Sequence, residues 1–146
     1  MKYTNTIQID LPRENVVEIL NNAENMKYWM KDLISYKILS DNPDRVGAQM
    51  ELQYLMGKRN CTMIETITEI NFPEKFSATY ETKGVWNSVQ NTFTENPDGT
   101  TQWLSDSEFR FSGFMKLMSW FMPTSMFKKQ SCKYLDDFKK FAESKD

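Results

Sequence analysis

The stretch AQMELQYLM, residues 48–56, carries the clearest structural pattern in the chain. Every second residue from Ala48 to Met56 is apolar, and Gln49, Glu51 and Gln53 alternate with them. Such alternation is typical of a strand that is packed on one face and open to water on the other, as in many antiparallel sheets. We therefore expect an antiparallel sheet with one buried face.

Outward from this stretch, an extended pattern runs from residue 34 to residue 111. Turn-forming sequences interrupt it at residues 41–44, 56–58, 71–74, 83–84 and 96–99. Five turns separate six strands, and an alternating segment at residues 2–9 predicts one strand before them. Between residues 59 and 70 neither alternating set is consistently apolar, which predicts a β-bulge.

Helical patterns stand at both ends of the strand run. Pro12 suits the first turn of a short helix, and a second short helix is expected over residues 26–33. After residue 113 the pattern is helical again, and Pro123 must either kink that helix or begin the next one. The order predicts an α+β fold in which a curved six- to seven-stranded sheet wraps around a long C-terminal helix and leaves a cavity between them.

The composition excludes several classes of enzyme. The 146 residues include no histidine, which rules out Ser-His-Asp and Cys-His nucleophiles and histidine-based zinc or iron sites. Cys61 and Cys132 are the two thiols, and such widely separated cysteines make a poor metal site. We expect reduced cysteines, no metal and no cofactor.

Charge and hydropathy limit the partners. A net charge of −2 gives no long-range attraction to nucleic acid, so none is expected as a partner. The lysines near the C-terminus alternate with acidic residues, as on a solvated helix face. Residues 111–122 are too few to span a membrane, and residues 1–15 lack the apolar core of a secretory signal. We expect a cytoplasmic monomer or weak homodimer without integral membrane association.

Four segments carry a resemblance to a known superfamily. They are IDLPRENVVEIL at 9–20, ETITEINFPEKF at 65–76, FTENPDGTT at 93–101 and FSGFMKLM at 111–118. Together they resemble the START-like (Bet v 1-like) superfamily, specifically the SRPBCC domains of the polyketide cyclase/dehydrase and lipid-transport type. The resemblance covers residues 1–146 as one domain and implies the helix-grip fold. It also implies a hydrophobic ligand between sheet and helix, whereas a minority of members are aromatases or cyclases and others are adaptors.

The strand faces predict which residues line that cavity. The candidates are Trp29, Met50, Leu52, Tyr54, Glu65, Phe76, Tyr80, Asn91, Phe93, Trp103, Ser105, Phe109, Phe111, Met118, Met122, Phe127 and Tyr134. Any of the aromatic ones is also a normal core residue. Glu65 either faces water or turns inward with a raised pKa, and an inward Asn91 needs a hydrogen-bond partner. Ten methionines suit a surface that adapts to ligands of irregular shape.

Three functions remain open at this point. The favoured one is binding of a hydrophobic or amphipathic small molecule, such as a lipid, polyketide or isoprenoid-like compound, without catalysis. The first alternative is a cyclase or aromatase in which Tyr54, Tyr80 or Glu65 moves protons. The second is a protein-interaction adaptor, suggested by Trp86 and the apolar segment 114–122. Residues 120–124, around Pro123, are either a movable gate or a fixed hydrophobic anchor.

Overall fold

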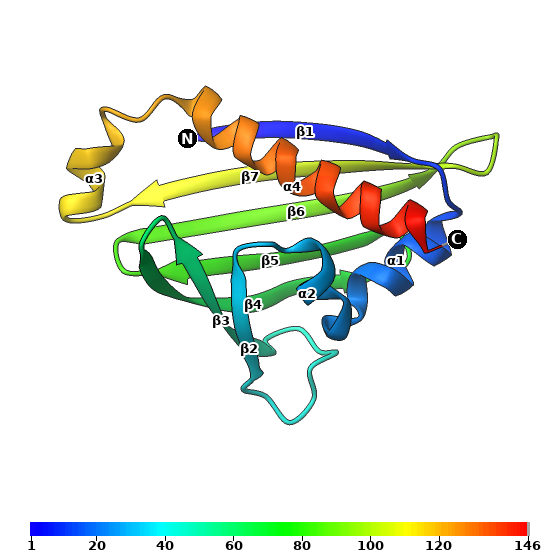
Figure 1. Ribbon diagram of the computed structural model, residues 1–146, viewed down its shortest axis with the longest axis horizontal. Coiled ribbons are helices and arrows are strands. Elements are labelled where there is room, and N and C mark those ends of the chain that lie inside the picture. Colours follow the sequence, from blue (N-terminus) through cyan, green and yellow to red (C-terminus); the bar gives the residue numbers. More distant parts are fainter. Residues whose placement is uncertain (146) are drawn as a thin grey trace.

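The computed structural model describes residues 1–145 and shows seven strands and a long C-terminal helix (Figure 1). The elements are β1 (Lys2–Ile9), α1 (Arg13–Asn21), the 3-10 turn η1 (Ala23–Asn25), α2 (Met26–Trp29), β2 (Leu33–Ile38), β3 (Gln49–Met56), β4 (Arg59–Asn71), β5 (Lys75–Thr82), β6 (Val85–Glu95), β7 (Thr101–Phe111), α3 (Phe114–Ser119) and α4 (Thr124–Ser144). The predicted order of strand, short helices, six strands and helix is therefore confirmed.

All seven strands form one antiparallel sheet in the order β1-β7-β6-β5-β4-β3-β2. Successive strands are neighbours from β2 to β7, and β1 joins β7 at the far edge. The register of β4 against β5 shifts between Ile67 and Glu69. This shift confirms the bulge predicted for residues 59–70, and it explains why no single alternation fits that strand.

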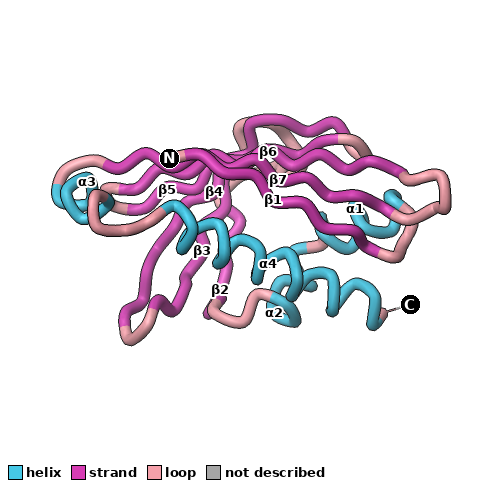
Figure 2. Tube along the Cα trace, turned by 90° about the horizontal axis from the view of Figure 1, so that it is seen from above, coloured by secondary structure: helices cyan, strands magenta, loops and turns pink. Residues whose placement is uncertain are grey.

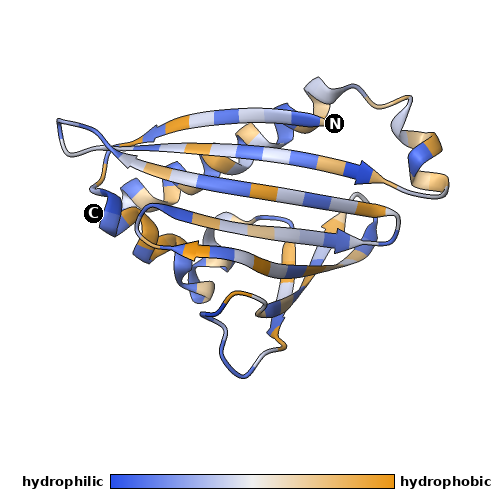
Figure 3. Ribbon diagram, turned by 180° about the vertical axis from the view of Figure 1, so that it is seen from behind, coloured by the Kyte–Doolittle hydropathy of each residue, from blue (hydrophilic) through white to orange (hydrophobic). Residues whose placement is uncertain are grey.

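The sheet is strongly curved, and α4 lies on its concave side (Figure 2). The same view shows β2 and β3 turning away from the plane of the other strands, toward the side that α4 occupies. Hydrophilic and hydrophobic residues alternate along the strands (Figure 3), so each strand has one inner and one outer side chain set. On β7 the inner set begins with Thr101, Trp103, Ser105 and Ser107, all buried.

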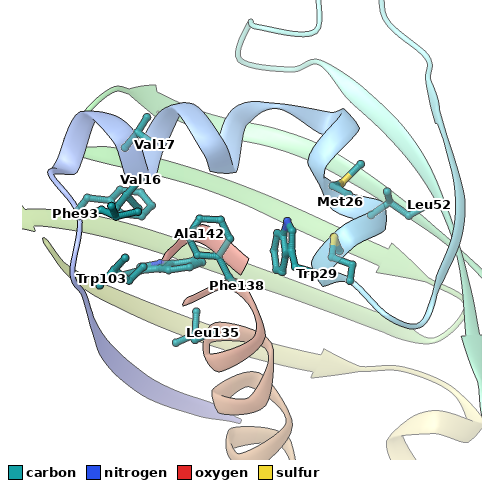
Figure 4. Packing of buried hydrophobic residues seen from close by; sticks show 13 residues of the cluster. Val16, Val17, Met26, Trp29, Leu52, Phe93, Trp103, Leu135, Phe138 and Ala142 are labelled. Atoms are coloured by element: carbon teal, nitrogen blue, oxygen red, sulfur yellow. The ribbon is translucent and has the colours of Figure 1, made fainter. Parts of the chain in front are cut away.

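The packed core gathers around the second half of α4 (Figure 4). Leu135, Phe138 and Ala142 lie on one helix face and are almost fully buried. The Phe138 ring meets Trp29 of α2 edge-on at 5.0 Å between centroids, and Trp103 of β7 at 5.2 Å. Val16 and Val17 close this core from α1. The core therefore occupies one end of the space between sheet and helix.

The first half of α4 is held mainly by hydrogen bonds to the edge strand β1. Asn5 Nδ2 donates to the Lys128 carbonyl at 3.2 Å, and the Tyr3 hydroxyl is bonded to Ser131. Pro123 precedes the first residue of α4, so it begins this helix and does not kink a longer one. Residues 124–126 and 128–130 of α4 are exposed. The helix is thus anchored along an edge and leaves the middle strands less covered.

Candidate ligand site on the inner face of the sheet

The strand register aligns five inner-face side chains in one row across the sheet. Met50 of β3 is paired with Glu65 of β4, Glu65 with Tyr80 of β5, Tyr80 with Asn87 of β6, and Asn87 with Phe109 of β7. Paired residues in neighbouring antiparallel strands point to the same face. Since Tyr80 and Met50 belong to the apolar set that packs against the core, the row faces inward. We call these five residues the inner row.

Two further phenols and an indole stand near the inner row. Tyr54 extends from β3 and Tyr134 from α4. Both lie close enough to Glu65 for its charge to raise the pKa of their phenols. The Tyr134 ring meets Trp29 edge-on at 4.6 Å between centroids. Trp29 Nε1 is buried and has no hydrogen-bond partner among the described residues. The site therefore combines one carboxyl, three phenols and an unpaired N–H in an otherwise apolar setting.

Burial sets the protonation of these groups. Desolvation raises the pKa of the Glu65 carboxyl above its ordinary value, and a hydrogen bond with the Tyr80 hydroxyl offsets only part of that rise. Desolvation also raises the pKa of the Tyr54, Tyr80 and Tyr134 phenols, and the charge of Glu65 adds to the rise in each. All three phenols therefore remain protonated at neutral pH and can donate hydrogen bonds to a ligand.

The residues around the inner row are not close-packed. Tyr134 packs edge-on against Trp29 and still keeps 39% of its surface accessible. Tyr54, Phe76, Tyr80 and Phe109 are likewise only partly buried. A well-packed core would leave apolar side chains at these positions with almost no accessible surface. Apolar surface on the inner face is thus available to a further molecule.

The predicted lining residues fall into three groups. Trp29, Leu52, Phe93 and Trp103 are almost fully buried and belong to the packed core. Around the inner row lie Met50, Tyr54, Glu65, Phe76, Tyr80, Phe109 and Tyr134. Phe111, Met118, Met122 and Phe127 lie toward α3, where the Phe127 ring packs on Phe109 and Phe111. Of these predicted residues, only those around the inner row remain candidates for the site, and Met118 of α3 is exposed.

Asn91 and Ser105 form part of the core and have partners within the fold. The two residues are paired across β6 and β7 and are buried. The Asn91 side-chain oxygen accepts a hydrogen bond of 2.8 Å from Trp103 Nε1. The hydrogen-bond partner that a buried Asn91 was expected to need is therefore Trp103. Asn87, in the inner row, donates at 3.1 Å to the Glu108 carbonyl.

Two shallow surface hollows lie elsewhere. One of about 580 Å³ is lined by residues of β1, the β6–β7 turn and β7, including Thr6, Pro97 and Gln102. The other, of about 260 Å³, lies between α1 and the end of α4, beside Glu18 and Lys145. Both have a polar lining that includes charged side chains, and neither includes the inner row. Among the described residues, no cluster of three or more metal-ligating side chains occurs either.

A family model described as polyketide cyclase/dehydrase and lipid transport matches residues 1–143. The chain belongs to this family. The search of curated proteins found no match. No helix among the described residues is long and apolar enough to cross a membrane.

Solved structures with the same fold as this family member are numerous and distant in sequence. The ZhuI aromatase/cyclase from Streptomyces sp. R1128 matches with a TM-score of 0.79 and 14% identity, over 98% of this chain and 93% of that one. Ara h 8.0201 matches with a TM-score of 0.78 and 12% identity, over 99% and 98%. A START superfamily protein from Mycobacterium smegmatis gives 0.73 and 14%, over 99% and 95%. These likenesses establish the Bet v 1-like helix-grip fold.

Three inner-face residues of this family member were not among the predicted site residues: Met63, Val89 and Asn87 of the inner row. Met63 is paired with the buried Leu52, and Val89 with Ala78 and Ser107, so both side chains face inward. The unclear alternation in β4 hid Met63, and only the position of the bulge reveals its side. Val89 follows the odd-numbered set of β6 and was detectable from that alternation. The unpaired Trp29 N–H carries no sequence signal, because it depends on packing.

Proposed function

We propose that this protein binds a hydrophobic or amphipathic small molecule against the inner row, on the concave side of the sheet next to α4. The observation that carries the proposal is the partial exposure of apolar side chains at positions where a filled core would bury them. A ligand that covered about 200 Å² of apolar surface there would gain roughly 5 kcal/mol from burial alone. The family match, which includes lipid transport, agrees with this role.

The polar groups of the inner row, together with the neighbouring Tyr54 and Tyr134, indicate which polar groups the ligand carries. The phenols of Tyr54, Tyr80 and Tyr134 offer donors, and Glu65 offers an acceptor or, when protonated, one more donor. A ligand with a carbonyl or hydroxyl group on an apolar body can pair with one or two of these groups. A purely aliphatic ligand leaves them unpaired at a cost of about 1–3 kcal/mol for each buried group. We therefore propose an oxygenated ligand such as an isoprenoid, polyketide or fatty acyl compound.

The test uses a neutral fluorescent probe, N-phenyl-1-naphthylamine, and two neighbouring substitutions on β6. Val89→Phe fills the inner side, whereas Ser88→Phe adds the same ring to the outer side, where Ser88 is paired with Thr79 and Glu108. We expect Val89→Phe to weaken probe binding by about tenfold or more, equivalent to about 1.4 kcal/mol, and Ser88→Phe to leave it unchanged. Circular dichroism checks that both variants fold.

Equal probe affinity in the two β6 variants would place the probe elsewhere and overturn the proposal. A second substitution keeps the test decisive if Val89→Phe does not fold. Tyr80→Phe removes one hydroxyl and no ring, so it retains the shape of the site. We expect native mass spectrometry to show a co-purified ligand in the wild type and a reduced ligand-bound fraction in Tyr80→Phe. Absence of any bound or bindable ligand in the wild type contradicts the proposal.

The direct pairing of Glu65 with Tyr80 in neighbouring strands supports a second candidate, proton-transfer catalysis of the cyclase/dehydrase type. A buried carboxyl with a raised pKa next to a phenol is a reasonable acid–base pair for enolisation or dehydration of a bound polyketide. An activity of this kind requires the Glu65 proton. We expect Glu65→Gln to reduce such a rate by about a hundredfold or more without loss of probe binding. An unchanged rate and pH profile would remove Glu65 from catalysis.

A further inference from the structure

One end of the molecule presents a group of apolar side chains directly to solvent. α3 and the segment that joins it to α4 project beyond the sheet at this end (Figure 1). Phe114, Trp120 and Phe121 are 72%, 72% and 79% exposed. Leu117, Met118 and Met126 are also exposed beside them in the chain. We call these six residues the α3 surface. Large exposed groups of this kind mark interaction sites in proteins.

The aromatic side chains of the α3 surface are held in place by local backbone structure. Beyond α3 the chain continues in tight turns, in which Trp120 N–H donates to the Leu117 carbonyl at 3.3 Å and Phe121 N–H to Met118 at 3.1 Å. At its base, Ser112 N–H donates to the Gly84 carbonyl at 3.0 Å, which ties this segment to the β5–β6 turn. The rings are thus presented on ordered turns, and their exposure does not result from an unstructured loop.

The charge around the α3 surface has one sign. Residues 109–135 contain five of the chain's 18 basic residues and none of its 20 acidic ones, so the rest of the chain is net negative. Lys116, Lys128 and Lys129 are exposed and form no ion pair among the described residues. Lys83 belongs to the β5–β6 turn that contacts this segment. Arg110 differs, because it pairs with Glu108 and stacks on Trp86 on the outer face.

A second turn adds apolar and basic groups at the same end. The β3–β4 turn lies toward the end of the long axis that carries α3 in both Figure 1 and Figure 2. It contributes exposed Met56 together with Lys58 and Arg59, which form no ion pair among the residues described. Two separate parts of the chain therefore bring the same combination of apolar and basic side chains to this end of the fold.

We propose that the α3 surface docks this protein onto anionic lipid bilayers. Trp120, Phe121 and Phe114 enter the boundary between headgroups and acyl chains, where aromatic rings are favoured, and the surrounding lysines face the phosphate layer. Each lysine near an anionic surface contributes about fivefold in affinity. Insertion is shallow and reversible, in keeping with the absence of any membrane-spanning helix among the described residues.

Charge complementarity selects a membrane over a second copy of the chain. A symmetric dimer through the α3 surface would bring its lysines together without opposing carboxylates, which disfavours that contact. An anionic bilayer supplies negative charge over its whole surface and an apolar layer beneath it. The docking proposal is independent of the proposed ligand, because vesicle binding is measured whether or not a ligand is present.

Vesicle co-sedimentation tests the docking directly. We expect the wild type to bind vesicles of phosphatidylcholine with about 30% phosphatidylserine at least tenfold more tightly than vesicles of phosphatidylcholine alone. Raising the salt concentration from about 0.1 M to about 0.5 M should weaken this binding, because the charges are exposed. Equal binding to both vesicle types, or no binding to either, would overturn the proposal.

Matched variants distinguish vesicle binding through the α3 surface from nonspecific binding through any exposed apolar residue. We expect Trp120→Ser/Phe121→Ser to lose at least about tenfold in vesicle affinity, and Lys128→Gln/Lys129→Gln a similar amount. Ile34→Ser/Val46→Ser replaces two exposed apolar residues with serine outside the α3 surface. This control variant should bind vesicles like the wild type. If these controls lose affinity to the same extent, the proposal is wrong.

Two further readouts keep the result unambiguous. Trp29 and Trp103 are buried and Trp86 stacks on Arg110 on the outer face, so a blue shift of tryptophan emission on vesicle addition should come from Trp120 and disappear in Trp120→Phe. Size-exclusion chromatography tests the alternative that a second copy of the chain covers the α3 surface. A wild-type dimer that becomes a monomer in Trp120→Ser/Phe121→Ser would make this surface a contact between copies and would refute membrane docking.

Discussion

Glu65 shows how one residue on the inner face links stability to pH. Its carboxyl has a raised pKa in the folded protein because burial disfavours the charged form. A carboxyl whose pKa is raised by burial binds its proton more tightly in the folded state than in the unfolded state. Its ionisation therefore costs stability, and the cost is absent below the unfolded pKa of about 4.3 and complete above the folded pKa.

Glu65→Gln should therefore raise the melting temperature at pH 8. Glutamine keeps an oxygen that accepts the Tyr80 hydrogen bond but carries no charge to desolvate. The gain should shrink as the pH falls toward 4, because the wild-type carboxyl is then protonated and the cost has gone. Thermal melts followed by circular dichroism across this pH range measure the difference.

Glu81→Gln is the control for this comparison, since Glu81 is the exposed neighbour of Tyr80 on the outer side of β5. It should change the melting temperature by less than about 2 °C at every pH. A Glu65→Gln variant that melts below the wild type at pH 8, or a gain that is independent of pH, would show that Glu65 is not desolvated as described.

At the scale of elements, α4 has two halves with different tasks. The half that contains Leu135, Phe138 and Ala142 completes the core, whereas the half before it touches β1 and leaves the middle strands accessible. Along α4, aromatic residues recur on one side at Phe127, Tyr134, Phe138 and Phe141. In the structure only Phe138 of these rings is fully buried, whereas Tyr134 is 39% exposed and Phe127 packs on Phe109 and Phe111 near the end of β7.

Phe138→Ala should destabilise the fold by about 3–5 kcal/mol, because it leaves a cavity between Trp29 and Trp103. Phe121→Ala removes the same ring from an exposed position and should cost less than about 0.5 kcal/mol. Urea unfolding followed by far-UV circular dichroism measures both values. A similar loss in the two variants would mean that the α3 segment packs against the core in solution.

The elements were easier to predict from the sequence than the site was. Alternation identified the strands and helical periodicity the helices, since both patterns reflect local geometry. Glu65 remained ambiguous because a single bulge in β4 decides which residues on either side of it face inward. The roles of Asn91 and Trp103 were also hidden, because a hydrogen bond between two strands follows from register and packing.

At the scale of the whole molecule, one end of the long axis is well packed and the other is not. The packed core lies around α1, α2 and the second half of α4, while α3 contains no buried residue. We expect backbone amides of residues 135–142 to exchange with deuterium at least about a hundredfold more slowly than those of residues 114–119. Hydrogen exchange followed by mass spectrometry measures this ratio. Equal protection of the two segments would contradict the described packing.

The strand order also determines where the native protein is prone to aggregate. The sheet has two edges, and α4 braces the β1 edge through Asn5 and Tyr3. The other edge is β2, which pairs with β3 on one side and carries exposed Ile34 and Ile38. An apolar edge of this kind is a template for strand addition between molecules, and Lys37 between these residues is a charge that opposes it. Aggregation of the native protein should therefore begin at β2.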